Sequence, residues 1–369
     1  MIKPLGKKRG GDIFIPMIAV SLALFGILTV YSASNYSARN DYGDKFFYVK
    51  KQAIGVCIGF IAMIFTANFD YGKYKKLGLP AVISGAVLLA AVFIPGVGVE
   101  SYGAKRWIGF AGVTIQPSEI AKFAFVIFTA GYFAKNPERV NKFSTLLPVL
   151  GVGAAFCLLI IIEPNMSITM CVGLLMIGML FAAGVKPKHL AAILIPIALA
   201  VPVLIIAEPY RLKRLSAFLD PWASPKGEGY QLLQSLYALG SGGFFGVGLF
   251  NSRQKFEFLP FSESDFILSV IGEELGFVGV VLLFAVTGFL IYRGIRAALR
   301  AKDLFGCLIA SGIVLVYAIQ VVINALVVSG SIPPTGLPLP LISSGNTSVI
   351  TFLAAFGVLY NVSKSGDAN

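Results

Sequence analysis

The stretch LFGCLIASGIVLVYAIQVVINALVVS, residues 304–329, decides the fold, because it contains no Asp, Glu, Lys, Arg or His. A helix needs roughly 20 such residues to cross the hydrocarbon of a bilayer. This stretch therefore predicts a membrane span. Nine similar apolar runs predict further spans, at residues 13–32, 52–68, 77–95, 118–134, 144–162, 166–185, 189–207, 266–292 and 346–362.

The composition agrees with a membrane protein. Of the 369 residues, 57% are hydrophobic and only 13% are charged, which excludes an ordinary soluble domain. The first apolar run is too long for a signal-peptide core and is kept as a span. We therefore expect an all-α polytopic membrane protein with about ten transmembrane helices, forming a single domain over residues 1–369.

The distribution of Lys and Arg predicts the orientation, because cytoplasmic loops are enriched in them. With the N-terminus inside, seventeen lie in cytoplasmic segments and six in the short outer loops. We therefore expect both ends in the cytoplasm of a bacterium and the long loop of about 208–265 outside. The net charge of +12 then faces anionic lipid, and nucleic acid is not an expected partner.

The cysteines and the single histidine give no sign of a metal or disulfide site. The cysteines lie inside apolar spans without CxxC spacing, so we expect packed small hydrophobic residues. His189 begins a span beside two lysines, which indicates an interfacial position. The residues concerned are Cys57, Cys157, Cys171, Cys307 and His189.

The long loop begins with EPYRLKRLSAFLDPW, residues 208–222. On a helix its apolar residues fall opposite its basic ones, so the segment should lie on the outer leaflet near lipid phosphates, unless it is a plain solvated connector. The residues are Leu212, Leu215, Phe218 and Leu219, opposite Arg211, Lys213 and Arg214. The next stretch, residues 229–249, predicts a helix with a polar stripe that includes Gln234, followed by a glycine-rich irregular backbone.

Two other outer segments resemble re-entrant structure. Residues 101–118 alternate in a way that predicts a short hairpin with Trp107 at the interface, and residues 330–348 contain too much Pro and Gly for a helix. Irregular backbone at membrane depth is tolerated only where it borders a protein-walled cavity. Both segments are therefore expected to border one.

Ionisable residues within spans are costly and suggest function. Glu119 and Lys122 stand three residues apart on one helix face, as a structural ion pair or as a wall of a substrate cavity. For the adjacent Glu273 and Glu274 a structural role is favoured. Asp265 begins the eighth span, where it is either a helix cap, whose helix N-terminus would favour the carboxylate, or a functional acid.

Four long motifs, in order, resemble the shape, elongation, division and sporulation (SEDS) family, which includes FtsW, RodA and SpoVE. They are GAKRWIGFAGVTIQPSEIAK at 103–122, GYQLLQSLYALGSGGFFGVGL at 229–249, LPFSESDFILSVIGEELGFVG at 259–279 and PPTGLPLPLISSGNTS at 333–348. The resemblance covers nearly the whole chain. Two departures are EPNMSIT, with Asn165 and Ser167 where the family commonly has an acid and a glycine, and Asn346 in place of a glycine. We expect Asn346 to adopt the positive φ that a glycine would take there, because asparagine tolerates it better than other non-glycine residues.

The resemblance implies a peptidoglycan glycosyltransferase that polymerises lipid II at the outer face of the cytoplasmic membrane, in elongation, division or sporulation. It implies that Asp265 is catalytic, that Glu119 and Lys122 line the central cavity, and that a class B penicillin-binding protein is the partner. We expect further substrate contacts from Arg106, Gln234, Lys255, Ser343 and Ser344. No metal site is defined, although a divalent cation (Mg²⁺ or Mn²⁺) would suit the leaving diphosphate.

Two alternatives belong to other classes: a flippase of lipid-linked sugars, and a noncatalytic scaffold for the transpeptidase. A polar cavity within ten helices also fits a flippase. However, the two halves of the chain contain no matching pair of broken helices, which carriers of that kind often have.

The orientation can be tested with a cysteine at Ser224 in the long loop. We expect Ser224→Cys to react with a membrane-impermeant maleimide in cells with intact inner membranes, because the loop should lie outside. Labelling that appears only after lysis would reverse the orientation.

Overall fold

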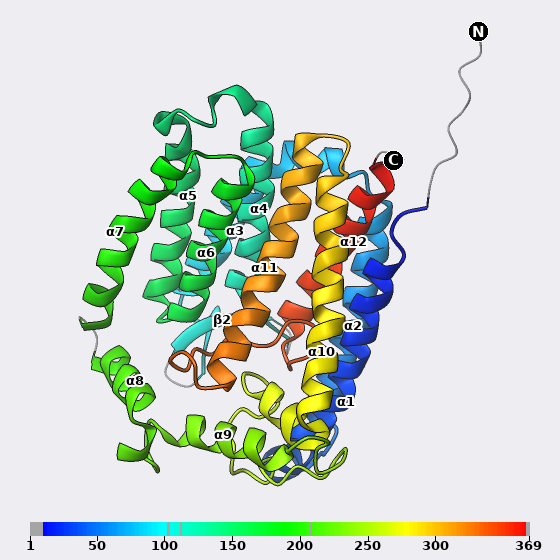
Figure 1. Ribbon diagram of the computed structural model, residues 1–369, viewed down its shortest axis with the longest axis vertical. Helices are drawn as coiled ribbons and strands as arrows, with labels where there is room; N and C mark the ends of the chain where they lie inside the picture. The colour runs from blue at the N-terminus through cyan, green and yellow to red at the C-terminus, as the bar shows by residue number, and fades with distance from the viewer. Residues whose placement is uncertain (1–9, 102–103, 111–112, 207–208, 367–369) are drawn as a thin grey trace.

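The computed structural model describes residues 10–101, 104–110, 113–206 and 209–366. Ten long helices run side by side as a bundle (Figure 1). They are α1 (Phe14–Tyr42), α2 (Phe47–Asn68), α3 (Gly78–Ala91), α4 (Pro117–Lys135), α5 (Phe143–Ile162), α6 (Met166–Ala182), α7 (Pro187–Ile206), α10 (Ile267–Leu299), α11 (Leu304–Val328) and α12 (Asn346–Ser365). Seven helical stretches in the described ranges are long and apolar enough to cross a membrane unaided. Each predicted span falls on one of the ten helices, which confirms the polytopic all-α fold.

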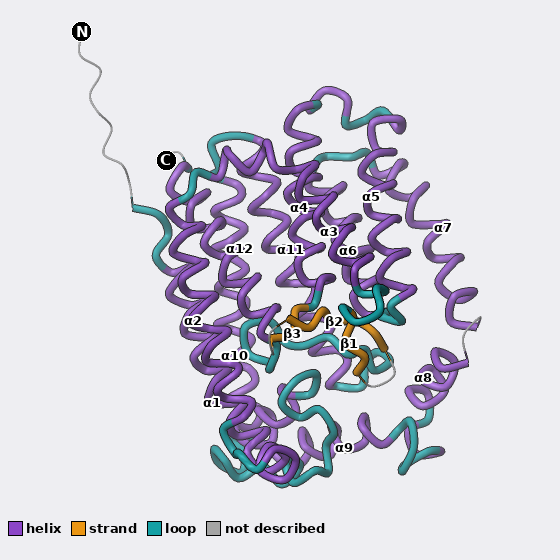
Figure 2. The backbone as a smooth tube through the Cα atoms, turned by 180° about the vertical axis from the view of Figure 1, so that it is seen from behind, coloured by secondary structure: helices purple, strands orange, loops and turns teal. Residues whose placement is uncertain are grey.

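One end of the bundle, called the site end here, holds α8 (Pro209–Leu219), α9 (Tyr230–Gly242), the irregular residues 243–266 and 331–345, and a small sheet (Figures 1 and 2). The predicted helix within 208–222 is present as α8, and the predicted helix at the start of 229–249 is present as α9. Glu208 lies outside the described residues. Leu212 and Leu219 of α8 are exposed, as expected for a helix at a membrane surface. At the opposite end, the Asp12 backbone N–H donates to Ser363 Oγ at 2.9 Å, so the first and last described segments meet.

The predicted hairpin is a three-stranded antiparallel sheet of β1 (Gly98–Ser101), β2 (Ala104–Phe110) and β3 (Val113–Ile115). Val99 pairs with Trp107, and Gly109 pairs with Thr114. The chain leaves β3 directly into α4, where Gln116 N–H donates to Thr347 Oγ1 of α12 at 3.0 Å. This contact fixes the sheet over the ends of two helices.

Two sequence expectations need correction. The glycine-rich stretch was expected to be irregular throughout, but α9 extends to Gly242, and the positive φ values begin at Gly243. Close packing of α9 against α10 explains this. Gly242 lies against the backbone of α10, where a Cβ would stand 2.0 Å from the Gly272 carbonyl oxygen. Cys57 was expected to be packed inside, but it lies on the exposed surface of α2. A thiol is apolar enough to face lipid there.

Helix α10 is interrupted at Gly276, whose φ of 65° and ψ of −167° are not helical. Residues 243–248 fill the interruption. The Val247 and Gly248 N–H groups donate to the carbonyl oxygens of Glu273 and Glu274 at 2.9 and 3.0 Å. The irregular backbone is thus satisfied by protein groups, as the apolar surroundings require.

Gly276→Ala should destabilise the protein strongly, because a Cβ there would stand 2.3 Å from the Gly246 nitrogen and the φ is positive. We expect a loss of about 2 to 4 kcal/mol in a thermal or denaturant unfolding experiment on purified protein. Gly288→Ala on the same helix is the matched control, because nothing lies within 4 Å of its added Cβ. Equal stability of the two variants would show that the interruption does not require glycine at position 276.

Candidate functional site

Asp265 lies at the site end, two residues before α10 begins, and its side chain is half-buried. It is not a helix cap: Phe266 occupies the N-cap position, and no side chain caps α10. The prediction of a capping role is therefore wrong. Gly336 passes directly over the carboxylate, since a Cβ built there would lie 3.2 Å from Asp265 Oδ2.

The surroundings raise the pKa of Asp265 to about 6. Burial is the main cause, and the negative charge of Glu263 adds to it, while the positive charges of Arg106 and Arg214 act in the opposite direction. We expected the helix N-terminus to favour the carboxylate, but loss of hydration outweighs it. Asp265 is thus mainly ionised at pH 7 and still basic enough to accept a proton.

The irregular segment 331–345 is fastened beside Asp265 by polar side chains. Ser343 Oγ donates to the Ser264 carbonyl at 2.5 Å and accepts from Leu339 N–H at 2.8 Å. Ser344 N–H donates to the Glu263 carbonyl at 2.8 Å. Asn324 Nδ2 of α11 donates to the carbonyl oxygens of both Asp265 and Leu337, each at 2.8 Å. Ser343 and Ser344 therefore lie next to Asp265, where their described bonds hold the backbone in place.

Two arginines, one from β2 and one from α8, lie close enough for their charges to act on Asp265. Arg106 of β2 donates through Nε to the Glu163 carbonyl at 3.3 Å and through Nη2 to the Pro164 carbonyl at 2.5 Å. Arg214 of α8 donates through Nη1 to the Pro334 carbonyl at 3.2 Å. The amphipathic helix thus contributes a cation to the site. The side chain of Arg211 lies outside the described residues.

Glu163 is a site residue that the sequence argument missed. It lies in the turn between α5 and α6, its side chain is 1% exposed, and neither carboxyl oxygen has a hydrogen-bond partner in the described part of the chain. Burial raises the pKa of Glu163 to about 8, against the nearby positive charge of Arg106. The signal in the sequence was an acid at the very end of an apolar run, in IIEPN at 161–165. We call Asp265, Arg106, Arg214, Glu163 and the backbone at 334–336 the Asp265 cluster.

Residues 13–367 match the family described as cell cycle protein, FtsW/RodA/SpoVE. The chain belongs to this family. It is 40% identical over 364 residues to Stage V sporulation protein E of Bacillus subtilis (strain 168), covering 97% of this chain and 98% of that protein.

A second relative and two solved structures agree. The chain is 39% identical over 356 residues to the probable peptidoglycan glycosyltransferase FtsW of Geobacter sp. (strain M18), covering 96% of this chain and 97% of that one. A chain in a solved peptidoglycan synthase complex, described as coordinating polymerization and crosslinking, superposes with a TM-score of 0.79 at 28% identity, covering 96% and 97% of the two chains. RodA of Thermus thermophilus shares the fold, with a TM-score of 0.71 at 24% identity, covering 97% and 98%.

The residues by which this chain departs from the family pattern have structural roles. Asn165 is the N-cap of α6, and its Oδ1 accepts from Ile168 N–H at 3.3 Å. Ser167 Oγ donates to the Thr335 carbonyl at 3.1 Å, which ties the α5–α6 turn to the segment over Asp265. Asn346 was expected to take a positive φ. Instead it is the first residue of α12, so a helical backbone is sufficient there.

Of two other expected substrate contacts, Lys255 is bound within the protein and Gln234 lies on α9. The Lys255 side chain is 5% exposed; its ammonium donates to the Phe250 carbonyl and lies 3.8 Å from Glu274 Oε1. It is therefore engaged within the protein, since a buried charge needs a partner. Gln234 is half-buried on α9, where the neighbouring Ser235 hydroxyl contacts Ser269 and the Val328 carbonyl.

Glu273 and Glu274 bind the loop that precedes Asp265. Glu273 accepts from the N–H groups of Arg253 and Gln254 at 3.0 and 3.4 Å, and Glu274 accepts from Ser252 N–H at 3.1 Å. Ser32 Oγ of α1 also donates to Glu274 at 2.5 Å. The favoured structural role of these glutamates is consistent with this arrangement.

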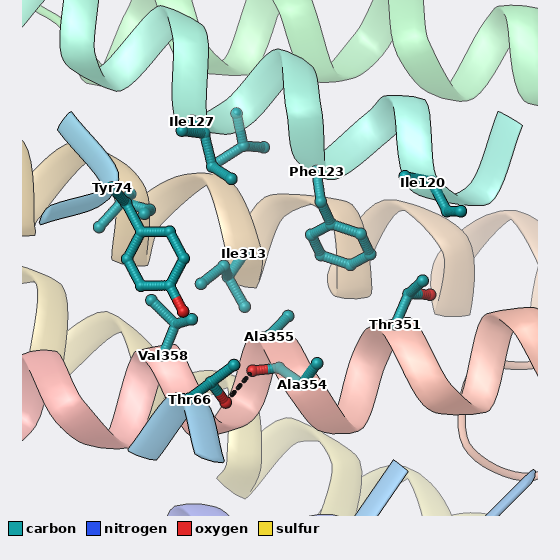
Figure 3. A pocket seen from close by; sticks show the side chains of 12 residues that line it. Thr66, Tyr74, Ile120, Phe123, Ile127, Ile313, Thr351, Ala354, Ala355 and Val358 are labelled. Carbon is teal, nitrogen blue, oxygen red and sulfur yellow. Dashed lines mark hydrogen bonds between the residues drawn. The ribbon is translucent and has the colours of Figure 1, made fainter. Parts of the chain in front are cut away.

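A separate apolar recess of about 180 Å³ lies between α2, α4, α11 and α12 (Figure 3). Two of its three hydroxyl groups are used locally: Thr66 Oγ1 donates to the Ala354 carbonyl at 2.8 Å, and Thr351 Oγ1 donates to the Thr347 carbonyl at 2.8 Å, while the third belongs to Tyr74. The remaining lining is mainly aliphatic and aromatic, including Ile120, Phe123 and Ile313. Such a recess suits hydrocarbon and not a sugar.

Glu119 and Lys122 of α4 form an ion pair of 2.8 Å in the core, and both side chains are buried. Lys122 Nζ also donates to Gln320 Oε1 of α11 at 2.7 Å. Glu119 Oε2 and Gln320 Nε2 have no partner among the described residues. The pairing expected from their spacing is present, and it joins α4 to α11 inside the bundle.

Removing one member of this pair should leave an uncompensated buried charge, at a cost of about 3 to 5 kcal/mol. We therefore expect Lys122→Met to lower the unfolding temperature of the purified protein markedly. The double variant Glu119→Gln with Lys122→Met should recover most of the loss, because no charge is left behind. If the double variant is no more stable than Lys122→Met, the two residues are not coupled. If it also recovers full glycan polymerisation, the pair has only a structural role.

Proposed function

We propose that this protein is a peptidoglycan glycosyltransferase that uses lipid II, with Asp265 as its general base. The observation that carries the site assignment is a half-buried carboxylate at the site end, with a pKa raised to about 6 and two arginines close enough to influence it. Family membership and relatives named as peptidoglycan glycosyltransferases support the activity.

The reaction would proceed as a single displacement. A sugar hydroxyl of one lipid-linked disaccharide attacks the anomeric carbon of another, and its proton passes to the Asp265 carboxylate. The bond from the anomeric carbon to the diphosphate oxygen breaks, and its electron pair leaves with the polyprenyl diphosphate. Attack opposite the leaving group inverts the anomeric carbon.

Arg106 and Arg214 would stabilise the negative charge that develops on the diphosphate, because guanidinium groups bind phosphate oxygens through charge-assisted hydrogen bonds. A divalent cation bound to the diphosphate would add to this effect. The part of the chain that the structure describes contains no group of three or more His, Cys, Asp and Glu residues suited to hold a metal.

The setting of the reaction is also part of the proposal. We place the protein, as a single membrane domain, in the bacterial cytoplasmic membrane, with both chain ends on the cytoplasmic side and the site end outside. The contact between the Asp12 and Ser363 segments supports a common side for the two ends. A class B penicillin-binding protein would crosslink the product, which the similarity to a chain of a peptidoglycan synthase complex supports.

The test is glycan-chain formation from lipid II by purified protein. Asp265→Asn keeps the shape but removes the proton acceptor, so the rate should fall by at least about 10², the lower range for a positioned general base. Stability should not fall, because Asp265 caps no helix and burial disfavours its charged form. A flippase or a scaffold would form no glycan chains at all, and wild-type synthesis by Asp265→Asn would remove the catalytic assignment.

The same assay as a function of pH tests the ionisation state. Asp265 must be ionised to accept a proton, and its pKa is raised to about 6, so the rate should fall as the pH drops below about 6. Glu263→Gln removes the negative charge that helps to raise this pKa, so its acid limb should move to lower pH. An unchanged acid limb in Glu263→Gln would indicate that another group controls it.

A further inference from the structure

Within the Asp265 cluster, the carboxyl group of Glu163 is buried but forms no hydrogen bond that would hold the described structure together. Both oxygens lack a hydrogen-bond partner within the described ranges, and the side chain is 1% exposed. Buried polar atoms in proteins almost always have partners, so an orphan at a site suggests a missing ligand.

Other groups hold the turn in which Glu163 lies. Arg106 binds the carbonyl oxygens of Glu163 and Pro164 and not the carboxyl group, Asn165 caps α6, and Ser167 binds the Thr335 carbonyl. The turn is therefore fixed through its backbone and its later residues. The Glu163 carboxyl group adds nothing to this arrangement.

The turn that contains Glu163 is nevertheless linked to Asp265 in two ways, through the charge of Arg106 and through a hydrogen bond to residue 335. The Arg106 charge acts on both Glu163 and Asp265. Thr335, which binds Ser167, precedes the glycine that passes over the Asp265 carboxylate. Among the described residues, Arg106 is the charged group that acts on Glu163.

Resting on the proposed function, we propose that Glu163, in its neutral form, donates a hydrogen bond to a phosphate oxygen of the lipid-linked diphosphate substrate. A neutral carboxyl group offers an O–H donor without adding negative charge, whereas a carboxylate would repel the anion. The pKa of about 8 keeps the group neutral at pH 7. Asp265, whose pKa is raised only to about 6, is mainly ionised at pH 7, so the two carboxyl groups would differ in protonation and in task.

Arg106 binds the same turn and is placed to contact the same anion. Its guanidinium donates to two neutral carbonyl groups of the α5–α6 turn. A diphosphate offers stronger, charge-assisted bonds, so Arg106 turns toward the anion when the substrate arrives. Arg106 and the Glu163 carboxyl group would then bind the same diphosphate.

The experiment compares purified full-length wild type, Glu163→Gln and Glu163→Ala in lipid II polymerisation at pH 7 and pH 9. Between these pH values the KM of the wild type should rise about tenfold, since one unit above its pKa only about a tenth of the carboxyl group is neutral. Glu163→Gln keeps a neutral donor, so its KM should stay within about threefold of wild type at pH 7 and should not rise at pH 9. Glu163→Ala should raise KM roughly tenfold at pH 7 with kcat little changed.

Glu138→Gln is the matched control, because Glu138 is exposed at the opposite end of the bundle and should show wild-type KM and pH dependence. A wild-type KM for Glu163→Ala at pH 7, or a rise for Glu163→Gln at pH 9 equal to that of the wild type, overturns the inference. If Glu163→Ala fails to fold, the comparison of wild type with Glu163→Gln decides alone. Absence of polymer from the wild type would instead overturn the proposed function.

Discussion

The architecture depends on one constraint: backbone N–H and carbonyl groups in an apolar surrounding must be bound by the protein itself. Helices meet it internally, but the site end contains long irregular segments that cannot. Polar side chains on neighbouring helices therefore bind them, as Asn324 of α11 binds the carbonyl groups of Asp265 and Leu337. Gln52 of α2 donates through Nε2 to the Ser343 carbonyl and accepts through Oε1 from the Gly345 N–H. The position of Asp265 follows from these few amide groups.

The same constraint explains why Glu273 and Glu274 are buried in α10. Two adjacent acids inside a helix would ordinarily be costly, but here they accept from the backbone N–H groups of residues 252–254, and Glu274 also has a partial partner in Lys255. The interruption at Gly276 frees carbonyl groups that residues 247 and 248 bind in turn. These hydrogen bonds join residues 247–254 to the part of α10 that follows Asp265.

Patterns local in the sequence predicted most of the fold. Apolar runs located the ten long helices, alternation located the hairpin around Trp107, and a spacing of three residues predicted the Glu119–Lys122 pair. What could not be predicted depends on segments distant in the chain. Lys255 looked like a free cation until Glu274 and the Phe250 carbonyl were found beside it. Glu163 received no role from the sequence, because only the folded chain shows that Arg106 binds its backbone and that its carboxyl group has no hydrogen-bond partner among the described residues.

The bond between Gln52 and the Ser343 carbonyl has a consequence for biogenesis. The two residues are 291 positions apart in the chain. At a synthesis rate of about 5 to 20 residues per second, the ribosome needs on the order of 15 to 60 seconds to make the intervening chain. During that time α2 is already made, while its amide has no final partner. The early helices must therefore be sheltered within the insertion machinery or by one another until the C-terminal part of the bundle arrives, and the completed site end is assembled as a late event in biogenesis.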